Sequence, residues 1–238
     1  MAFDRRTLIL HHTQSRLVVP AGFTARPAAT LFLVDASGSM GGFGQAPADA
    51  ARSYIKELKE SCNADIIAAG IATFANAIVP VIPLQPVRDI DLSTFVYTAM
   101  GGTFLNGTMA AVLPGLIELH QHVLDQTQNR VDLSVVLGLV TDGDDTTSPA
   151  EAIHEVRRLA PEAMRRKFSL KIYGLGVDAA SIAHNMGFVN SEGKVHAETQ
   201  NLRHDNVEDL RHSAVHTARA AHRSTIINIP IVDPDSQP

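Results

Sequence analysis

The chain has 238 residues, a length that suits one α/β domain, and 45% of them are hydrophobic, which is enough for one substantial core. The formal net charge is -5 with the histidines neutral, and the charges are scattered, which argues against a nucleic-acid partner held by a basic face. Cys62 is the only cysteine, which excludes a disulfide within the chain, and we expect it to be a small buried apolar residue late in a helix.

The apolar segments are too short for a membrane protein. No stretch approaches the roughly 20 apolar residues that a membrane span needs, and the N-terminal sequence MAFDRRTLIL lacks the apolar core of a signal peptide. We therefore expect a cytoplasmic protein with no membrane partner.

Hydrophobic patterning predicts strands and helices that alternate through most of the chain. The apolar run PAATLFLVD is typical of a strand buried on both faces. The strands expected at 64–75 and 77–86 are joined by a short link, so we predict a hairpin whose second strand is antiparallel, with prolines that suit a sheet edge. Ser148 and Pro149 are expected to be the N-cap and the first residue of a helix. In chain order we predict two short strands within 7–22, a strand at 27–35, a helix at 46–62, strands at 64–75 and 77–86, a helix at 101–127, a strand at 131–143, a helix at 148–166, a strand at 168–178, a short helix at 179–187, a turn between two short strands at 188–199, and a helix at 207–223.

This alternation predicts the fold class. We expect an α/β fold that is doubly wound, with a mainly parallel central sheet, one antiparallel edge strand and helices on both faces. The domain is expected at 27–223, after an N-terminal extension at 1–26 in which a β-hairpin is one option, and before a C-terminal tail at 224–238.

Oxygen-bearing side chains follow the predicted core strands. Asp35 ends the first core strand and Asp142 ends a later one, so both carboxylates belong at the same rim of a parallel sheet. Ser37 and Ser39 alternate with Asp35, and Thr103 follows a glycine pair from which a loop can reach that rim. Two carboxylates and three hydroxyls form a hard, all-oxygen ligand set. It suits Mg²⁺ or Mn²⁺, with Ca²⁺ as a further candidate.

Three motifs carry a family resemblance. D-x-S-x-S after an apolar strand, a later G-G-T, and a still later T-D-G after another strand resemble a von Willebrand factor A (vWA) domain, in the family's order. The resemblance covers roughly residues 28–223 and implies the family's doubly wound, Rossmann-like sheet. It also implies a metal-ion-dependent adhesion site (MIDAS), with hydroxyl ligands from Ser37, Ser39 and Thr103, and with Asp35 and Asp142 acting directly or through bound water.

The resemblance implies a binding protein and not an enzyme. In the family, a position on the metal held only by water is taken by an Asp or Glu of a protein partner. The chain looks like the intracellular, bacterial-type members, which resemble adaptors that work with AAA+ ATPases or with kinase and phosphatase partners in stress or defence systems. The sequence does not specify an oligomeric state.

Other interpretations of the same residues remain. Asp35, Ser37 and Ser39 alone are compatible with a turn capped by side chains, and Gly38 to Gly44 with a flexible surface loop at the mouth of the site rather than a phosphate loop. The 11 histidines do not share a zinc-like spacing; His212 and His216 are four apart but lack a third ligand.

Other functions also remain. A metal-dependent phosphoester hydrolase would use Asp144 or Asp145 as its base, although more often such residues belong to a solvated loop or a helix N-terminus. A structural assembly subunit would use the metal only to brace its loops. A surface adhesin is a weaker option.

Overall fold

The computed structural model describes residues 26–93, 95–128, 131–203 and 207–226. The strands are β1 (Ala28–Asp35), β2 (Ile67–Phe74), β3 (Ile78–Pro86), β4 (Ser134–Thr141), β5 (Ser169–Leu175) and β6 (Glu198–Leu202). The α-helices are α2 (Ala46–Lys59), α3 (Leu105–Gln126), α4 (Ala150–Arg165), α5 (Ala179–Asn185) and α6 (Val207–Ser224). Short 3-10 helices occupy η1 (Gly38–Phe43), η2 (Ala64–Ile66) and η3 (Val87–Asp89). The predicted strands within 7–22 and most of the tail at 224–238 lie outside the described residues.

The strands form one six-stranded sheet in the order β3-β2-β1-β4-β5-β6. Of the six described strands only β3 is antiparallel to its neighbour, and it lies at an edge, as its prolines predict. The parallel strand β1 lies in the centre between β2 and β4. The predicted fold class is therefore confirmed.

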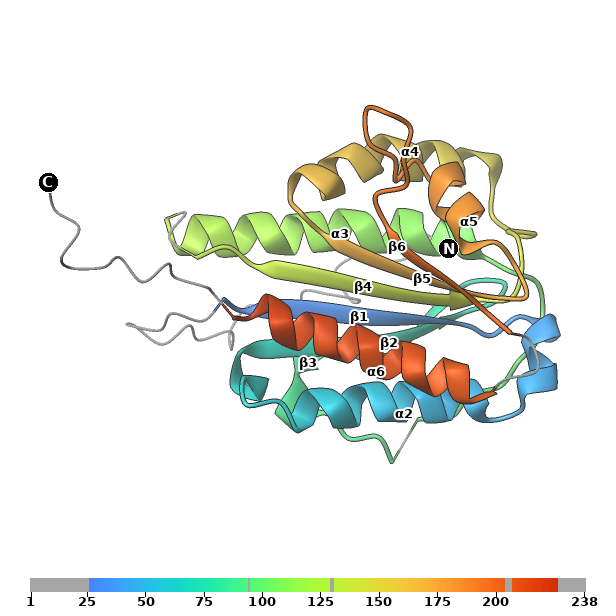
Figure 1. The fold of residues 1–238 in the computed structure, drawn as a ribbon, viewed down its shortest axis with the longest axis horizontal. Helices are drawn as coiled ribbons and strands as arrows, with labels where there is room; N and C mark the ends of the chain where they lie inside the picture. Colours follow the sequence, from blue (N-terminus) through green and yellow to red (C-terminus); the bar gives the residue numbers. More distant parts are fainter. Residues whose placement is uncertain (1–25, 94, 129–130, 204–206, 227–238) are drawn as a thin grey trace, which may run out of the picture.

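Helices cover both faces of the sheet (Figure 1). Every residue of β1 is buried, and alternate side chains enter different cores. Leu31 and Leu33 pack in the core that contains α3, α4 and α5, whereas Phe32 and Val34 pack in the core that contains α2 and α6. The continuous apolar run in the sequence is thus explained by burial on two sides.

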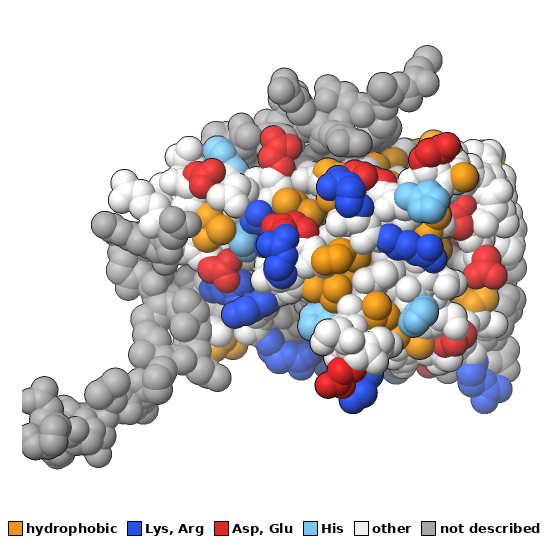
Figure 2. Space-filling model, turned by 90° about the horizontal axis from the view of Figure 1, so that it is seen from above, with side chains coloured by type: hydrophobic (Ala, Val, Ile, Leu, Met, Phe, Trp, Pro, Cys, Tyr) orange, Lys and Arg blue, Asp and Glu red, His pale blue; other side chains and the backbone are white. Residues whose placement is uncertain are grey.

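The outer face over α4 and α5 carries mixed charges. Figure 2 shows Lys and Arg side chains interspersed with Asp and Glu and with small hydrophobic areas on this face, rather than a patch of a single sign. Among the described helices, none is long and apolar enough to cross a membrane.

Several sequence predictions need correction. Cys62 is exposed, because α2 ends at Lys59, and its Sγ lies 3.4 Å from Nε2 of His222. For the turn between two short strands predicted at 188–199, the described residues show a single antiparallel bridge between Val189 and Val195. The strand β6 begins only at Glu198 and extends past the predicted range; its side chains are largely exposed and polar and give no hydrophobic alternation.

The glycine-rich segment after Ser37 also differs from its prediction as a flexible loop. Residues 38–43 form the 3-10 helix η1 instead of an irregular loop. Met40 and Phe43 anchor this helix, since both side chains are buried in the core under α2.

Candidate metal centre

The centre lies where β1 and β4 end side by side. Val34 pairs with Val140 in the parallel ladder, so the next residues, Asp35 and Thr141, reach the same edge of the sheet and Asp142 follows. This edge is formed by the carboxyl ends of parallel strands, where α/β sheets usually bind their ligands.

Asp35 is fully buried and makes two hydrogen bonds through its carboxylate. Oδ1 accepts from the backbone N–H of Ser37 at 2.8 Å, and Oδ2 accepts from the Thr141 hydroxyl at 2.6 Å. Burial raises the pKa of the Asp35 carboxyl above its ordinary value; the hydrogen bonds from Thr141 and Ser37 act against this, and repulsion from Asp142 adds to it. The ionised carboxylate is therefore costly in this position without a nearby positive charge.

The two serines connect Asp35 to Asp142. Ser37 Oγ lies 3.0 Å from Ser39 Oγ, and the Ser39 hydroxyl donates to Asp142 Oδ1 at 2.9 Å. Ser37 is buried, whereas Ser39, in the first turn of η1, is exposed. The alternation of residues 35, 37 and 39 thus brings three side-chain oxygen groups to one place, as the sequence predicts.

Thr103 reaches the same place from the loop before α3. Gly101, with φ of 79°, accepts a hydrogen bond from Gly38 N–H at 2.9 Å, which ties this loop to the segment after β1. The Thr103 hydroxyl faces the segment after β4, since a Cβ placed on Gly143 would lie 3.8 Å from Thr103 Oγ1. Among the described residues this hydroxyl has no hydrogen-bond partner, so it is available to a ligand.

Residues 31–212 match the family model of the von Willebrand factor type A domain. The chain belongs to the von Willebrand factor type A domain family. A search of curated proteins gave no match.

Solved structures share this vWA fold at low sequence identity. The PilB minor pilin from Streptococcus sanguinis has a TM-score of 0.55 and 11% identity, over 87% of this chain and 63% of the pilin chain. Proximal thread matrix protein 1 from the mussel byssus has a TM-score of 0.55 and 14% identity, over 84% of this chain and 47% of its own. The vWF domain of the type V pili tip protein Mfa5 from Porphyromonas gingivalis has a TM-score of 0.50 and 12% identity, over 87% of this chain and 99% of that domain. The chain thus spans less than two thirds of the first two, and the likeness concerns the fold alone.

The vWA site has donors that fit a hard divalent cation. Its side chains offer carboxylate and hydroxyl oxygens, the ligands that Mg²⁺ and Mn²⁺ prefer. Among the described residues no lysine, arginine or histidine forms an ion pair with the buried Asp35 carboxylate, and none is among the groups that shift its pKa most. Also within the described ranges, no group of three or more His, Cys, Asp or Glu could hold a metal elsewhere. The zinc interpretation of the histidines gains no support.

A side-chain cap from the loop after β4 holds the start of α3. Asp145 accepts from the N–H of Asn106 at 2.5 Å, and the Ser148 hydroxyl accepts from the N–H of Gly107 at 2.8 Å. The prediction that Ser148 caps its own helix is therefore wrong, because α4 begins at Ala150 with Pro149 at the N-cap. Asp145 is used structurally, which leaves Asp144 as the exposed carboxylate of the pair.

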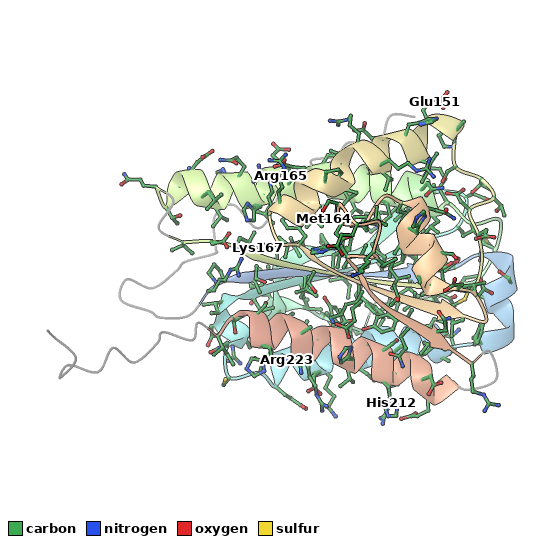
Figure 3. All side chains as sticks on the ribbon, turned by 45° about the horizontal axis from the view of Figure 1, so that its top comes forward. Glu151, Met164, Arg165, Lys167, His212 and Arg223 are labelled. Atoms are coloured by element: carbon green, nitrogen blue, oxygen red, sulfur yellow. The ribbon has the colours of Figure 1, made fainter. Side chains whose placement is uncertain are left out.

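Asp144 and Asp145 also line a pocket of about 420 Å³ beside the site. Its lining also includes Leu105, Ile182 and Arg157, whose Nε donates to the Asn185 carbonyl at 2.7 Å. Glu151, at the first turn of α4, lies at this same end of the molecule (Figure 3).

Sequence reasoning missed two side chains that position the site. The Tyr97 hydroxyl donates to the Asp35 carbonyl at 2.8 Å, and Asn76 Oδ1 accepts from Gly102 N–H at 2.8 Å. Burial and the two nearby carboxylates, Asp35 and Asp142, raise the pKa of Tyr97, so its hydroxyl stays a donor at neutral pH. Neither residue belongs to a recognisable spacing. Thr141, by contrast, stands inside the T-D-G motif and could have been singled out.

Proposed function

We propose that this vWA domain is a divalent-metal-dependent protein-binding module. Asp35, Ser37, Ser39, Thr103 and Asp142 would hold Mg²⁺ or Mn²⁺, with Ca²⁺ as a weaker candidate. The ion would supply a Lewis-acidic position for an Asp or Glu carboxylate of a protein partner. The observation that supports this most is the convergence of oxygen donors from three separate loops around a buried carboxylate that has no ion-pair partner among the described residues.

A binding role is favoured over hydrolysis by the placement of the candidate bases. Asp145 is committed to the start of α3, and the three motif segments contain no histidine or lysine. A hydrolase needs a free base next to the metal-bound nucleophile. Asp144 is the group that remains to be tested for that role.

Within this proposal, the chain acts as a cytoplasmic adaptor of the bacterial stress or AAA+-associated kind. This setting rests on resemblance to the intracellular members of the family. The pilus and byssus roles in the names of the solved structures are not carried over, since identities of 11 to 14% support only the fold.

The test is selection from a randomised nine-residue peptide display library. The immobilised full chain is panned in Mg²⁺ and in EDTA, with Thr103→Ala as the variant. We expect peptides enriched in Asp or Glu at one position, in Mg²⁺ only and with the wild type only. Selection that is equal in EDTA, or equal for Thr103→Ala, contradicts metal-dependent recognition of a carboxylate.

A further inference from the structure

Exposed large hydrophobic residues gather at the metal end of the molecule. In the described part of the chain four such residues stand out: Val96 at 75% exposure, Met100 at 63%, and Val79 and Ile226 at 54% each. Val79 pairs with Thr73, which pairs with Val34, so Val79 lies at the level of the strand ends. Single exposed hydrophobic residues are common, but three of four at one end suggest an interaction surface.

Val96 and Met100 point outward because the segment that carries them is extended. Burial alternates from residue 95 to 98, with Phe95 and Tyr97 inward and Val96 and Thr98 outward, and Met100 is exposed further along. The inward residues fix the segment, since Phe95 and Tyr97 are both buried in the core under α2. The outward side chains are therefore presented by a braced backbone.

Side chains of α2 and the preceding residue brace this segment from one side. Arg52 donates to the Phe95 carbonyl at 3.2 Å, and its guanidinium lies 5.6 Å from the centre of the Phe95 ring. Gln45 donates to the Tyr97 carbonyl at 3.3 Å.

Residues 36–38, directly after β1, brace the segment that carries Val96 and Met100 from the other side. Met100 N–H donates to the Ala36 carbonyl at 2.7 Å, and Gly38 N–H donates to the Gly101 carbonyl at 2.9 Å. These two bonds flank Ser37 on both sides along the chain. Met100 is thus held one backbone hydrogen bond away from the segment that carries the candidate ligands.

We propose that Val96 and Met100 form an apolar strip that receives apolar side chains of the same partner segment whose Asp or Glu reaches the metal. This inference rests on the proposed function. Residues 95–103 contain no charged side chain, so the strip favours an apolar occupant over a second charged one. Met100 N–H bonds to the carbonyl of Ala36, directly before Ser37, and an extended peptide advances about 3.3 Å per residue. We therefore expect the apolar residue that reaches Met100 within about three positions of the acidic one. The flexible thioether of Met100 can adapt to Leu, Ile, Met or Phe.

The experiment uses the peptides selected in Mg²⁺ from the randomised library. Affinities of the full chain are measured for a selected peptide and for the same peptide with its apolar residue changed to Ser. The protein variants are Val96→Ser, Met100→Ser and, as the matched control, Ile226→Ser. Ile226 is a similarly exposed apolar residue just after α6, and Arg223 near that end of α6 lies far from Glu151 in Figure 3.

We expect an apolar residue within three positions of the selected acid, and a roughly five- to tenfold loss of affinity for Val96→Ser and for Met100→Ser. Ile226→Ser should bind as the wild type does. The peptide with Ser in place of its apolar residue should bind wild type and Met100→Ser equally. The Mg²⁺-induced rise in melting temperature should persist in Met100→Ser, which shows that the metal site is intact.

Four results overturn the inference. Selection of an acidic residue with random flanking residues would refute the apolar strip but not the metal-dependent binding. Full affinity of Met100→Ser for the selected peptide would do the same. A Mg²⁺-dependent dimer that dissociates in Met100→Ser, seen by light scattering, assigns the strip to a second copy of the chain. If no peptides with Asp or Glu are selected in a Mg²⁺-dependent way, the proposed function is refuted, and so is the apolar strip that rests on it.

Discussion

The Thr141 hydroxyl donates a 2.6 Å hydrogen bond to the Asp35 carboxylate and so links the ends of β4 and β1. The same hydroxyl lies 3.1 Å from the Gly143 carbonyl, which ties the link to the loop that carries Asp142. The two central strands therefore share one small polar contact that orients a carboxylate of the candidate metal centre.

Removal of this contact in Thr141→Val should weaken the metal site more than the fold. We expect a loss of about 1–2 kcal/mol in the free energy of unfolding, because a buried carboxylate oxygen loses a donor. Metal affinity should fall roughly tenfold, since Asp35 is no longer held. Thr217→Val is the control: its buried hydroxyl bonds to Tyr173 at 2.9 Å on the α6 side, so it should lose similar stability but keep metal affinity. Equal metal affinities in the two variants contradict the role given to Thr141.

Asp35→Asn should have opposite effects without and with metal. Because burial raises the folded-state pKa of Asp35 above 3.8, the folded chain binds more protons than the unfolded chain between these two pKa values. The contribution of the Asp35 carboxyl to the free energy of unfolding is thus fully present below pH 3.8. It is lost as the pH rises through the folded-state pKa. At pH 7 in EDTA, the neutral Asn should therefore raise the melting temperature, whereas in excess Mg²⁺ the wild type should be the more stable. Thermal unfolding in both buffers measures this, and a lower melting temperature for Asp35→Asn in EDTA would falsify it.

Asn76→Ala should disturb the site from the β2–β3 turn. The Asn76 amide accepts from Gly102 N–H and packs against Gly101, where a Cβ would lie only 2.6 Å from Nδ2. We expect a cost of about 1 kcal/mol in unfolding free energy and a several-fold loss of metal affinity, because Thr103 follows directly. Asn63→Ala is a matched control, since Asn63 bonds to Thr225 at 2.8 Å near the end of α6. Calorimetric titration of Mg²⁺ should separate the two variants; identical affinities would remove Asn76 from the site.

Asp145→Ala and Asp144→Ala should differ in stability. Asp145 caps the start of α3, so its loss should cost about 1 kcal/mol or somewhat more, whereas loss of the exposed Asp144 should cost less than about 0.5 kcal/mol. Urea unfolding measures both. Neither the wild type nor Asp144→Ala should cleave a panel of phosphoesters. Turnover by the wild type that disappears in Asp144→Ala, with metal binding kept, would establish the hydrolase instead.

The sheet and the five candidate ligands could be predicted from the sequence for a physical reason. Strands buried on two faces leave continuous apolar runs, and the rim of a parallel sheet collects whatever side chains follow those runs, such as Asp35 and Asp142. The structure brings the five residues together as the motifs predict. Their role as metal ligands stays a prediction.

The missed features depend on contacts between distant segments. β6 has mostly exposed polar side chains, so no periodicity marks it as a strand. Tyr97 acts on Asp35 from 62 positions away, and Ser148 caps a helix that begins 43 residues before it. Such pairings are decided by tertiary packing, which local patterns do not encode. The exposure of Cys62 has a simpler cause, because the helix stops three residues earlier than its hydrophobic pattern suggests.

The most direct measurement is thermal unfolding of the wild type and of the Ser37→Ala/Ser39→Ala double variant in EDTA, Mg²⁺, Mn²⁺ and Ca²⁺. An ion that binds only the folded chain stabilises it by about 2.7 kcal/mol at a hundredfold excess over its Kd. The account predicts a clear rise in melting temperature for the wild type in Mg²⁺ or Mn²⁺, and none for the double variant, which keeps Asp35 and Asp142. An unchanged melting temperature in all four buffers, or an equal rise in the double variant, would contradict a metal centre built from these residues.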